Sequence, residues 1–416
     1  MPFAPSPLTM TSAVFVMTYL ALALGRVPGL QVDRPGIALI GAAMMLAAGL
    51  LDLPAAAAAI DMETIALLFG MMALVAYLQI AGFFQWAASA LARREPGPHG
   101  LLAITISLSG ILSAFLVNDV VCVALTPLVL NLCRRRGRHA MPYLIGLATA
   151  SNIGSVATIT GNPQNMMIGT LSGISYRDFA TRLVPVALVG LALNYLVVAW
   201  VYRRMLSEPD AHPATANPLE MESAGIHRGL LAKGLAVTSA VIVLFFAGYP
   251  VATVALVAAA VMMLGQVRPH EVYQRIDWSL LVMFMGLFVV VHGFDSQVVR
   301  TWGLDQWDVV TRSPVIAISL LSVVLSNLVS NVPAVLLFKP VVSATSDPDQ
   351  AWLALAMSST LAGNLTVLGS VANLIVVETA RRLGTHIGFA EYLKAGIPVT
   401  ILTVAFGMAW LLLTGS

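Results

Sequence analysis

Two stretches of this 416-residue chain repeat one arrangement of asparagine, glycine and proline within apolar sequence. The first reads SAFLVNDVVCVALTPLVL and then ATASNIGSVATITGNPQN; the second, about 210 residues later, reads SNLVSNVPAVLLFKP and then STLAGNLTVLGSVAN. Asn118 lies 34 residues before Asn152, and Asn331 lies 33 residues before Asn364. Broken membrane helices offer carbonyl oxygens that suit Na⁺ and helix N-termini that suit an anion. The duplicated pattern therefore indicates a binding site between two repeats of a secondary transporter.

Asp119 is the single acidic residue in the apolar stretch from Gly100 to Leu132, and its counterpart in the second stretch is Val332. An ionised Asp at the centre of a bilayer costs at least about 2.5–3.5 kcal/mol, so an intramembrane carboxylate indicates function. It could be a ligand of Na⁺, or a proton carrier whose pKa burial would raise. The structural alternative is that Asp119 caps a short half-helix.

Composition places the chain among polytopic membrane proteins. It is 58% hydrophobic and 10% charged, with a mean hydropathy of +0.87. The net charge of +2, without a basic patch interleaved with aromatic residues, argues against binding of nucleic acid. The two cysteines, Cys122 and Cys133, provide neither a disulfide framework nor a four-thiolate metal site.

The elements that must position these residues are membrane helices. A spanning helix needs roughly 20 mostly apolar residues. This length predicts ten spans: Thr11–Leu30, Gly36–Leu51, Thr64–Ala81, Pro142–Ile168 and Leu183–Val201 in the first half, and Gly234–Ala247, Val251–Gly265, Ser279–Gly293, Ala351–Val376 and Gly396–Leu413 in the second. Two further apolar stretches, 100–132 and 314–342, each carry an asparagine near the middle. Each stretch could be one long helix, two full spans, or a re-entrant hairpin.

The distribution of basic residues favours the hairpins. With five crossings and one hairpin per half, 17 Lys and Arg residues fall on one side of the membrane and four on the other, with Lys339 left inside the second hairpin. The four are Arg177, Arg182, Arg300 and Arg312. Because basic residues accumulate in cytoplasmic loops, the larger group is expected in the cytoplasm and both termini outside.

The expected fold is all-α, with two inverted repeats that each hold five transmembrane helices and one re-entrant hairpin. The first repeat covers residues 1–202, with hairpin 100–132 and broken helix 142–168. Residues 203–233 form a cytoplasmic linker, and residues 234–416 form the second repeat, with hairpin 314–342 and broken helix 351–376. Because five crossings are an odd number, the second repeat is inverted. Segments Phe83–Arg93 and Gln297–Val309 are expected to lie along the two membrane interfaces.

The segments SNIGSVATITGNPQN and GNLTVLGSVANLIV resemble the ion transporter superfamily. The similarity is to the branch of arsenite permeases, D-type sodium/proton antiporters and citrate-transporter-like anion permeases, and it extends from RVPGLQVDRP to the last span. In the dicarboxylate branch, a Ser five residues before the tip Asn, the Asn itself and a Gly of the next broken helix hold Na⁺. The resemblance thus implies coupling-ion positions at Ser113, Asn118, Gly161, Ser326, Asn331 and Gly369. The intramembrane carboxylate of Asp119 is added to this set as a possible ligand of the coupling ion.

The resemblance also implies substrate contacts at Asn118, Asp119, Asn162, Asn331 and Ser370. The amides of Asn165 and Asn373, at the ends of the interruptions GNPQN and GSVAN, complete the predicted set. The hairpin tips of that branch read Ser-Asn-Thr, whereas the tips here read Val-Asn-Asp and Ser-Asn-Val. Two threonine hydroxyls that would hold a carboxylate are therefore absent and a negative charge is present. This Asn-Asp tip resembles the arsenite and antiporter branch.

The sequence therefore predicts an ion-coupled carrier of a small anion or oxyanion, such as arsenite, in the plasma or inner membrane. The alternative is a sodium/proton antiporter that uses Asp119. Neither an enzyme nor a cofactor is expected, beyond Na⁺ or H⁺ as coupling ion. A serine hydrolase is disfavoured because Ser172 lies in a polar loop away from the membrane, and no repeated selectivity filter indicates a channel. The resemblance implies a homodimer, and any use of ATP would need a separate subunit because no GxxxxGK[ST] segment occurs.

Topology gives the first testable prediction. In a variant without Cys122 and Cys133, a Thr215→Cys substitution should stay unlabelled by a membrane-impermeant thiol reagent in intact cells, because the charge distribution places residues 203–233 in the cytoplasm. A Ser172→Cys control should be labelled, since that loop is predicted to lie outside. Labelling of Thr215→Cys from outside would contradict the predicted topology and place residues 203–233 outside the cell.

Overall fold

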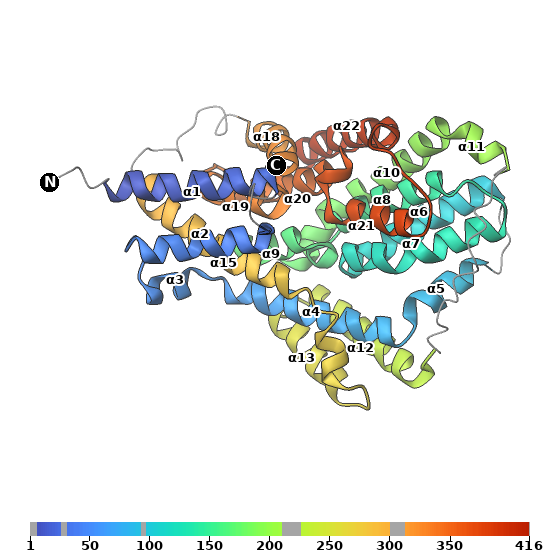
Figure 1. The fold of residues 1–416 in the computed structure, drawn as a ribbon, viewed down its shortest axis with the longest axis horizontal. Coiled ribbons are helices and arrows are strands. Elements are labelled where there is room, and N and C mark those ends of the chain that lie inside the picture. Colours follow the sequence, from blue (N-terminus) through green and yellow to red (C-terminus); the bar gives the residue numbers. More distant parts are fainter. Residues whose placement is uncertain (1–5, 26–30, 93–96, 210–225, 300–312, 416) are drawn as a thin grey trace.

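The computed structural model describes residues 6–25, 31–92, 97–209, 226–299 and 313–415 (Figure 1). These residues form helices and no named strand. Within the described ranges, seven helices are long and apolar enough to cross a membrane, and four shorter apolar helices accompany them. The predicted all-α polytopic fold is confirmed.

The first half contains ten α-helices and one 3₁₀ turn among the described residues. They are α1 (Pro7–Leu24), α2 (Arg34–Ala47), α3 (Leu53–Ala59), α4 (Met62–Ile80), α5 (Phe83–Ala92), α6 (Pro98–Phe115), α7 (Asn118–Arg135), α8 (Met141–Ser155), η1 (Ile159–Gly161), α9 (Pro163–Ser172) and α10 (Tyr176–Val201). The short helix α11 (Arg203–Ser207) follows α10 directly.

The second half begins at α12 (Arg228–Phe246). It continues with α13 (Val251–Met263), α14 (Pro269–Tyr273), α15 (Trp278–Phe294), the π turn η2 (Asp295–Val299), α18 (Pro314–Val329), α19 (Asn331–Ser343), α20 (Pro348–Ala362), the 3₁₀ turn η4 (Val367–Gly369), α21 (Val371–Arg382) and α22 (Phe389–Thr414). In Figure 1, helices from both halves mix: α2 lies beside α15, and α21 lies beside α7 and α8.

The stretch 100–132 is broken at its centre into the hairpin α6–α7. Ser109 Oγ donates to the carbonyl of Leu147 (2.8 Å), and Ser113 Oγ lies 2.9 Å from Ser151 Oγ, so α6 runs in the same direction as α8. Helix α7 runs in the opposite direction. It starts beside the end of α8, because Asn118 Nδ2 donates to Asn152 Oδ1 (3.1 Å), and it ends five residues before α8 begins.

The stretch 314–342 is likewise the hairpin α18–α19. Asn327 Nδ2 donates to the carbonyl of Ala362 (3.0 Å), and Ser322 Oγ bonds Ser358 Oγ, so α18 runs in the same direction as α20. Helix α19 ends four residues before α20 begins and is antiparallel to it. The tip of this hairpin is Ser330, whose φ of 79° makes it the one residue other than glycine in the left-handed region among the described residues.

The two hairpins enter from opposite ends of the molecule. Helix α10 is antiparallel to α8, since Asn194 Nδ2 donates to Gly146 O (3.3 Å) while Tyr176 at the other end bonds Thr160 (3.0 Å).

Helices α10 and α22 are also antiparallel. Tyr202 Oη at the end of α10 donates to Glu391 O (2.7 Å) at the start of α22. Gln350 Nε2 donates to Leu411 O (2.8 Å), so α20 starts where α22 ends. Helices α8 and α20, and the hairpins attached to them, therefore start from opposite ends. The two-fold axis between repeats and the domain limits at 202 and 233 remain predictions.

Several predicted spans differ in length from the helices. Helix α1 ends at Leu24 instead of Leu30, because Gly25 takes a left-handed φ of 71° and caps it. At roughly 1.5 Å per residue, the 14 residues of α2 and the 13 of α13 cover only about 20 Å. Most of segment 297–309 and residues 210–225 of the linker lie outside the described residues.

Close glycine contacts pack the hairpins and the remaining helices. A Cβ atom at Gly154 of α8 would lie 2.1 Å from the backbone oxygen of Gly110 in α6. Similar approaches join α4 to α13, where Gly70 faces Ala255, and α15 to α2, where Gly286 faces Ala38. A side chain at these positions would force backbones apart.

This packing gives the second prediction. Gly154→Ala should lower the melting temperature of the detergent-solubilised protein, because the added methyl group meets backbone atoms that cannot rotate away. Overpacking of this kind costs about 1–3 kcal/mol. Gly229→Ala, in the first turn of α12 and with no atom within 4 Å of the new Cβ, should leave the melting temperature unchanged or slightly higher. Equal melting temperatures for both variants would contradict the proposed contact.

Candidate functional site

Two asparagines hold the breaks of the two interrupted helices in the same way. Asn165 Nδ2 donates to the carbonyl oxygens of Ser155 (3.0 Å) and Thr158 (3.2 Å). Asn373 Nδ2 donates to the carbonyl oxygens of Gly363 (2.6 Å) and Thr366 (3.1 Å). These acceptors lie 10 and 7 residues before each asparagine, at carbonyls that a continuous helix would have paired. The amides therefore replace the backbone hydrogen bonds that each break removes.

These contacts leave Asn165 and Asn373 little capacity for substrate. Both side chains are fully buried. The Oδ1 of Asn165 accepts from Thr360 Oγ1 (3.3 Å), and that of Asn373 accepts from Asn152 Nδ2 (3.1 Å). Both were predicted as substrate contacts. The structure places them inside the protein, bonded to it through both amide atoms.

Asn162 starts the second half-helix of the first break. Its Oδ1 accepts from the backbone N–H of Asn165 (2.8 Å), which caps α9. Its Nδ2 donates to Ser155 Oγ (2.9 Å) and to Thr360 Oγ1 (3.2 Å), so the cap of the first break contacts α20 of the second half. Gln164 Nε2 also reaches Thr360 Oγ1 (3.3 Å). The predicted contact Asn162 is thus buried between the two halves.

Asn152 is the centre of the polar network. Its Nδ2 donates to Asn364 Oδ1 (2.9 Å) and Asn373 Oδ1 (3.1 Å). Its Oδ1 accepts from Asn118 Nδ2 (3.1 Å) and Ser370 Oγ (2.9 Å). One amide therefore joins the tip of the first hairpin, helix α8 and the second break. Asn152 is not among the predicted site residues. In the sequence it served only to measure the spacing from Asn118.

The sequence spacing predicts that Asn152 and Asn364 are equivalent positions of the two repeats, and this prediction is wrong. The contacts of Asn165 and Asn373 relate the two breaks by 208 residues, so the position equivalent to Asn152 is Thr360. Asn152 lies inside α8, whereas Asn364 follows the end of α20. The similar spacings of 34 and 33 residues arose because both residues are asparagines near a break.

Glycine is required at both breaks. A Cβ on Gly161 would lie 2.3 Å from the carbonyl oxygen of Ser155, and a Cβ on Gly369 would lie 2.8 Å from Asn327 Oδ1. Asn327 belongs to α18, and Thr366 Oγ1 donates to the same Oδ1 (3.3 Å). In the first half, Thr158 Oγ1 donates to the carbonyl of Ala114 in α6. Each hairpin is therefore bonded to the break of its own half.

Several buried oxygens at the tips have no hydrogen-bond partner among the described residues: Asn118 Oδ1, Asn331 Oδ1, Ser326 Oγ and Ser359 Oγ. An unpaired buried oxygen is costly unless a ligand satisfies it. Amide and hydroxyl oxygens are hard ligands of the kind that cations such as Na⁺ accept. Three of these residues, Asn118, Asn331 and Ser326, are predicted coupling-ion positions, and the donor set fits that group.

The two predicted coupling-ion serines, Ser113 and Ser326, differ in their hydrogen bonds. Ser113 Oγ lies 2.9 Å from Ser151 Oγ, which donates to the carbonyl of Asn118 (3.1 Å). In the second half, the equivalent hydroxyls of Ser326 and Ser359 are both buried without a partner. The two halves therefore share these serines, but the hydrogen bonds of the serines differ.

Asp119 lies in the first turn of α7 and is half-buried. No described residue forms a hydrogen bond or ion pair with its carboxylate, and α7 has no side-chain cap. The structural alternative, in which Asp119 caps the half-helix through a hydrogen bond, is therefore absent. The carboxylate keeps its oxygens available beside the helix N-terminus, which favours negative charge.

Comparison with known proteins identifies the family. Residues 13–362 match the citrate transporter family. The silicon efflux transporter LSI3 of Oryza sativa subsp. japonica is 32% identical, over 96% of this chain and 96% of that protein. The chain belongs to the citrate transporter family. The putative transporter arsB of Dictyostelium discoideum is 27% identical and covers 93% of this chain and 88% of its own length.

Solved structures support the fold of this citrate transporter family member. The Alcanivorax borkumensis YdaH transporter covers 99% of this chain and 98% of its own, with a TM-score of 0.61 and 15% identity. Neisseria gonorrhoeae MtrF covers 99% and 96%, with a TM-score of 0.59 and 12% identity. The resemblance to the ion transporter superfamily is confirmed, and the chain is a multi-pass membrane transporter that moves ions or small solutes across a bilayer.

The third prediction tests the network of this transporter. Asn152→Ala should abolish transport while the protein still reaches the membrane, because it leaves Asn118 Nδ2 and Ser370 Oγ without their shared acceptor and uncouples the tip from the second break. Each buried polar atom left unpaired costs about 1–3 kcal/mol.

Asn194→Ala is the matched control. Asn194 is also fully buried, and its amide bonds Thr149 Oγ1 (2.8 Å) and Gly146 O (3.3 Å) away from both tips. This variant should lose stability but retain transport per folded molecule. If the two variants lose transport equally at equal amounts of folded protein, Asn152 has no special role.

Proposed function

We propose that this member of the citrate transporter family is an ion-coupled carrier of a small oxyacid or its anion, of the arsenite or silicic acid kind. One observation supports this substrate class most. The tips and breaks, residues 110–124, 149–168, 324–336 and 358–376, contain no Lys, Arg or His. Amide, hydroxyl and carboxylate groups remain, and these suit hydroxyl groups of a weakly acidic oxyacid.

A citrate-like substrate fits less well. Several carboxylates would need positive partners in a site of low dielectric, because burying an unpaired charge is expensive. Asp119 would add repulsion. The names of the relatives point in the same direction, since one is a silicon efflux transporter and another is called arsB.

Coupling of transport to an ion gradient would use the polar groups that have no hydrogen-bond partner among the described residues. The carboxylate of Asp119 would bind a cation or carry a proton, and the oxygens of Asn118, Asn331 and Ser326 would complete cation sites. Asn118 and Ser370, which donate to the same oxygen of Asn152, are the predicted substrate contacts within this network. Asn331 adds an oxygen without a partner among the described residues at the second tip.

Hairpins that enter from opposite ends support alternating access. In this proposal the two tips lie on either side of the substrate, which would then meet one face of the membrane at a time. In this proposal both termini lie outside the cell membrane.

A second candidate function is sodium/proton antiport through Asp119, and the specific observation in its favour is the carboxylate without a protein partner. Reconstituted proteoliposomes distinguish the two. Uptake or release of arsenite and silicic acid is measured under a Na⁺ gradient and under a pH gradient, each without the other. Solute movement under either gradient supports the carrier. Proton release driven by Na⁺ without any solute supports the antiporter.

The fourth prediction concerns Asp119. Asp119→Asn keeps size and hydrogen-bonding ability but removes the charge, so gradient-driven transport should be lost or become independent of pH and Na⁺. Asp349→Asn is the matched control, because Asp349 occupies the same helix position, the second residue of α20, and is exposed. Val332→Asn in the other tip should leave the coupling ion unchanged. Wild-type rate and ion dependence in Asp119→Asn would remove Asp119 from the mechanism.

A further inference from the structure

A second polar site lies at the end of the molecule where α7 ends and α8 begins. A cavity of about 250 Å³ is lined by Arg134, Arg138, His139 and His386, together with backbone of Ala140 and Gly384 and the apolar side chains of Leu130, Met141 and Met205. No acidic residue is among these described lining residues. The charge distribution of the sequence predicts that this end faces the cytoplasm.

The cationic groups of this cavity are arranged by the backbone around it. Arg134 NH2 donates to the carbonyl of Leu383, where Gly384, with φ of 80°, ends α21. Gly137, with φ of 57°, turns the chain after α7, and Arg138 pairs with Pro209 through its backbone. The α7–α8 turn, the end of α11 and the α21–α22 loop thus meet at one point.

Two groups at this cavity could donate hydrogen bonds to an anion. Nε of Arg138 is buried and has no hydrogen-bond partner among the described residues, and such a donor is expensive to leave unpaired. Helix α8 starts at the cavity without a side-chain cap, and Ala140 and Met141 at this start belong to the lining. The N–H groups of its first turn, apart from Pro142, which has none, and its positive dipole end are therefore close to the cavity.

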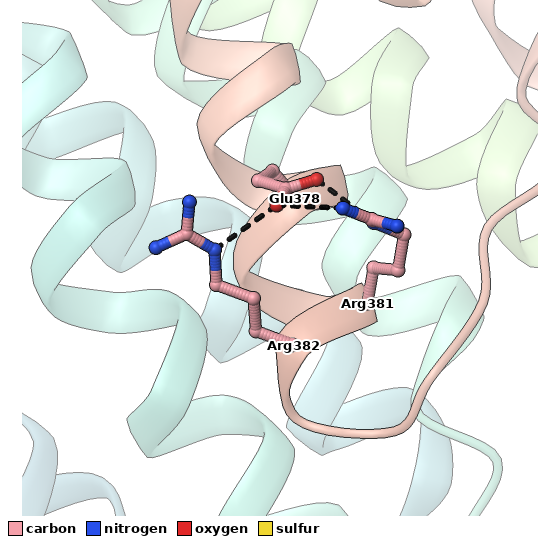
Figure 2. Close-up of polar contacts among 3 residues, drawn as sticks. All are labelled: Glu378, Arg381 and Arg382. Atoms are coloured by element: carbon pink, nitrogen blue, oxygen red, sulfur yellow. Dashed lines mark hydrogen bonds and ion pairs between the residues drawn. The ribbon is translucent and has the colours of Figure 1, made fainter.

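Two carboxylates on the nearby helices α21 and α22 are already paired. Figure 2 shows Glu378 bonded to Arg381 (2.9 and 3.0 Å) and to Arg382 (3.0 Å) on the last turns of α21. These arginines, Arg381 first, hold the pKa of the Glu378 carboxyl at about 2. Glu391 is bonded to Lys394. Neither carboxylate therefore neutralises the cavity.

We propose that this cavity binds a phosphate group, held by Arg138, His386, His139 and the N-terminus of α8. Arginine recognises phosphate oxygens through its planar fork, and helix N-termini supply N–H donors to the same group. The group can belong to free phosphate or to the headgroup of an anionic phospholipid, because the apolar side of the cavity at Leu130, Met141 and Met205 accommodates an acyl-linked ligand. The bound phosphate joins elements of both halves at this end.

Two binding measurements on the purified full chain test the site. The first titrates inorganic phosphate in detergent at constant ionic strength and follows thermal stability, with chloride as the reference anion. The second counts bound lipids by native mass spectrometry from nanodiscs of phosphatidylglycerol or of phosphatidylcholine. Saturable stabilisation by phosphate identifies a free anion as a ligand. Retention of phosphatidylglycerol alone identifies the lipid headgroup.

Arg138→Gln should weaken binding roughly tenfold or more, as the loss of a charge-assisted hydrogen bond predicts. His386→Gln, on an exposed loop, provides a second test if Arg138→Gln fails to fold. Arg204→Gln removes the same charge from α11 at the same end but outside the cavity, and should bind like the parent protein. The proposal is overturned if neither phosphate nor phosphatidylglycerol binds, or if Arg204→Gln weakens binding as much as the two cavity variants.

Discussion

The fold depends on satisfying backbone groups where two helices are interrupted inside an apolar protein. A carbonyl left unpaired at membrane depth costs several kcal/mol. Asn165 and Asn373 meet this constraint with one amide each, by donating to two carbonyls on the far side of the break. With the backbone satisfied in this way, half-helix ends can stay exposed to a binding site. The two breaks are therefore held by side chains that bond to protein through both amide atoms.

The same constraint explains how the halves are joined. Asn152 bonds four side chains at once and links the first tip to the second break, so movement of one tip is coupled to the other half through hydrogen bonds. The equivalent position holds Thr360, which bonds Asn162, Gln164 and Asn165. The two breaks have similar hydrogen-bonded frames, and polar contacts between them form one network. The tips themselves have diverged, with Asp119 in one and a left-handed Ser330 in the other.

The hairpins and breaks could be predicted because asparagine, glycine and proline interrupt apolar runs at matching places, and the all-helical fold follows from hydropathy. The roles of single asparagines could not be predicted. Which amide contacts a ligand and which holds backbone depends on distances between the halves, and sequence spacing does not encode these. Asn165 and Asn373 were expected at the substrate and are bonded to protein, whereas Asn152 was overlooked. Span limits also shifted where one glycine, Gly25, took a left-handed φ.

The contact between the hairpins and the surrounding helices is suited to movement. The second hairpin meets α1 and α15 largely through apolar side chains around a cavity of about 220 Å³, which includes Phe15, Phe294 and Leu336. Tyr19 Oη, which donates to Pro333 O (3.1 Å), is a polar contact across this boundary. Apolar contacts between helices can be exchanged for contacts with lipid at little cost, because lipid tails are as apolar as the side chains. In the proposed carrier, the polar network would hold the site together, and the apolar boundary around the second hairpin would allow that hairpin to move.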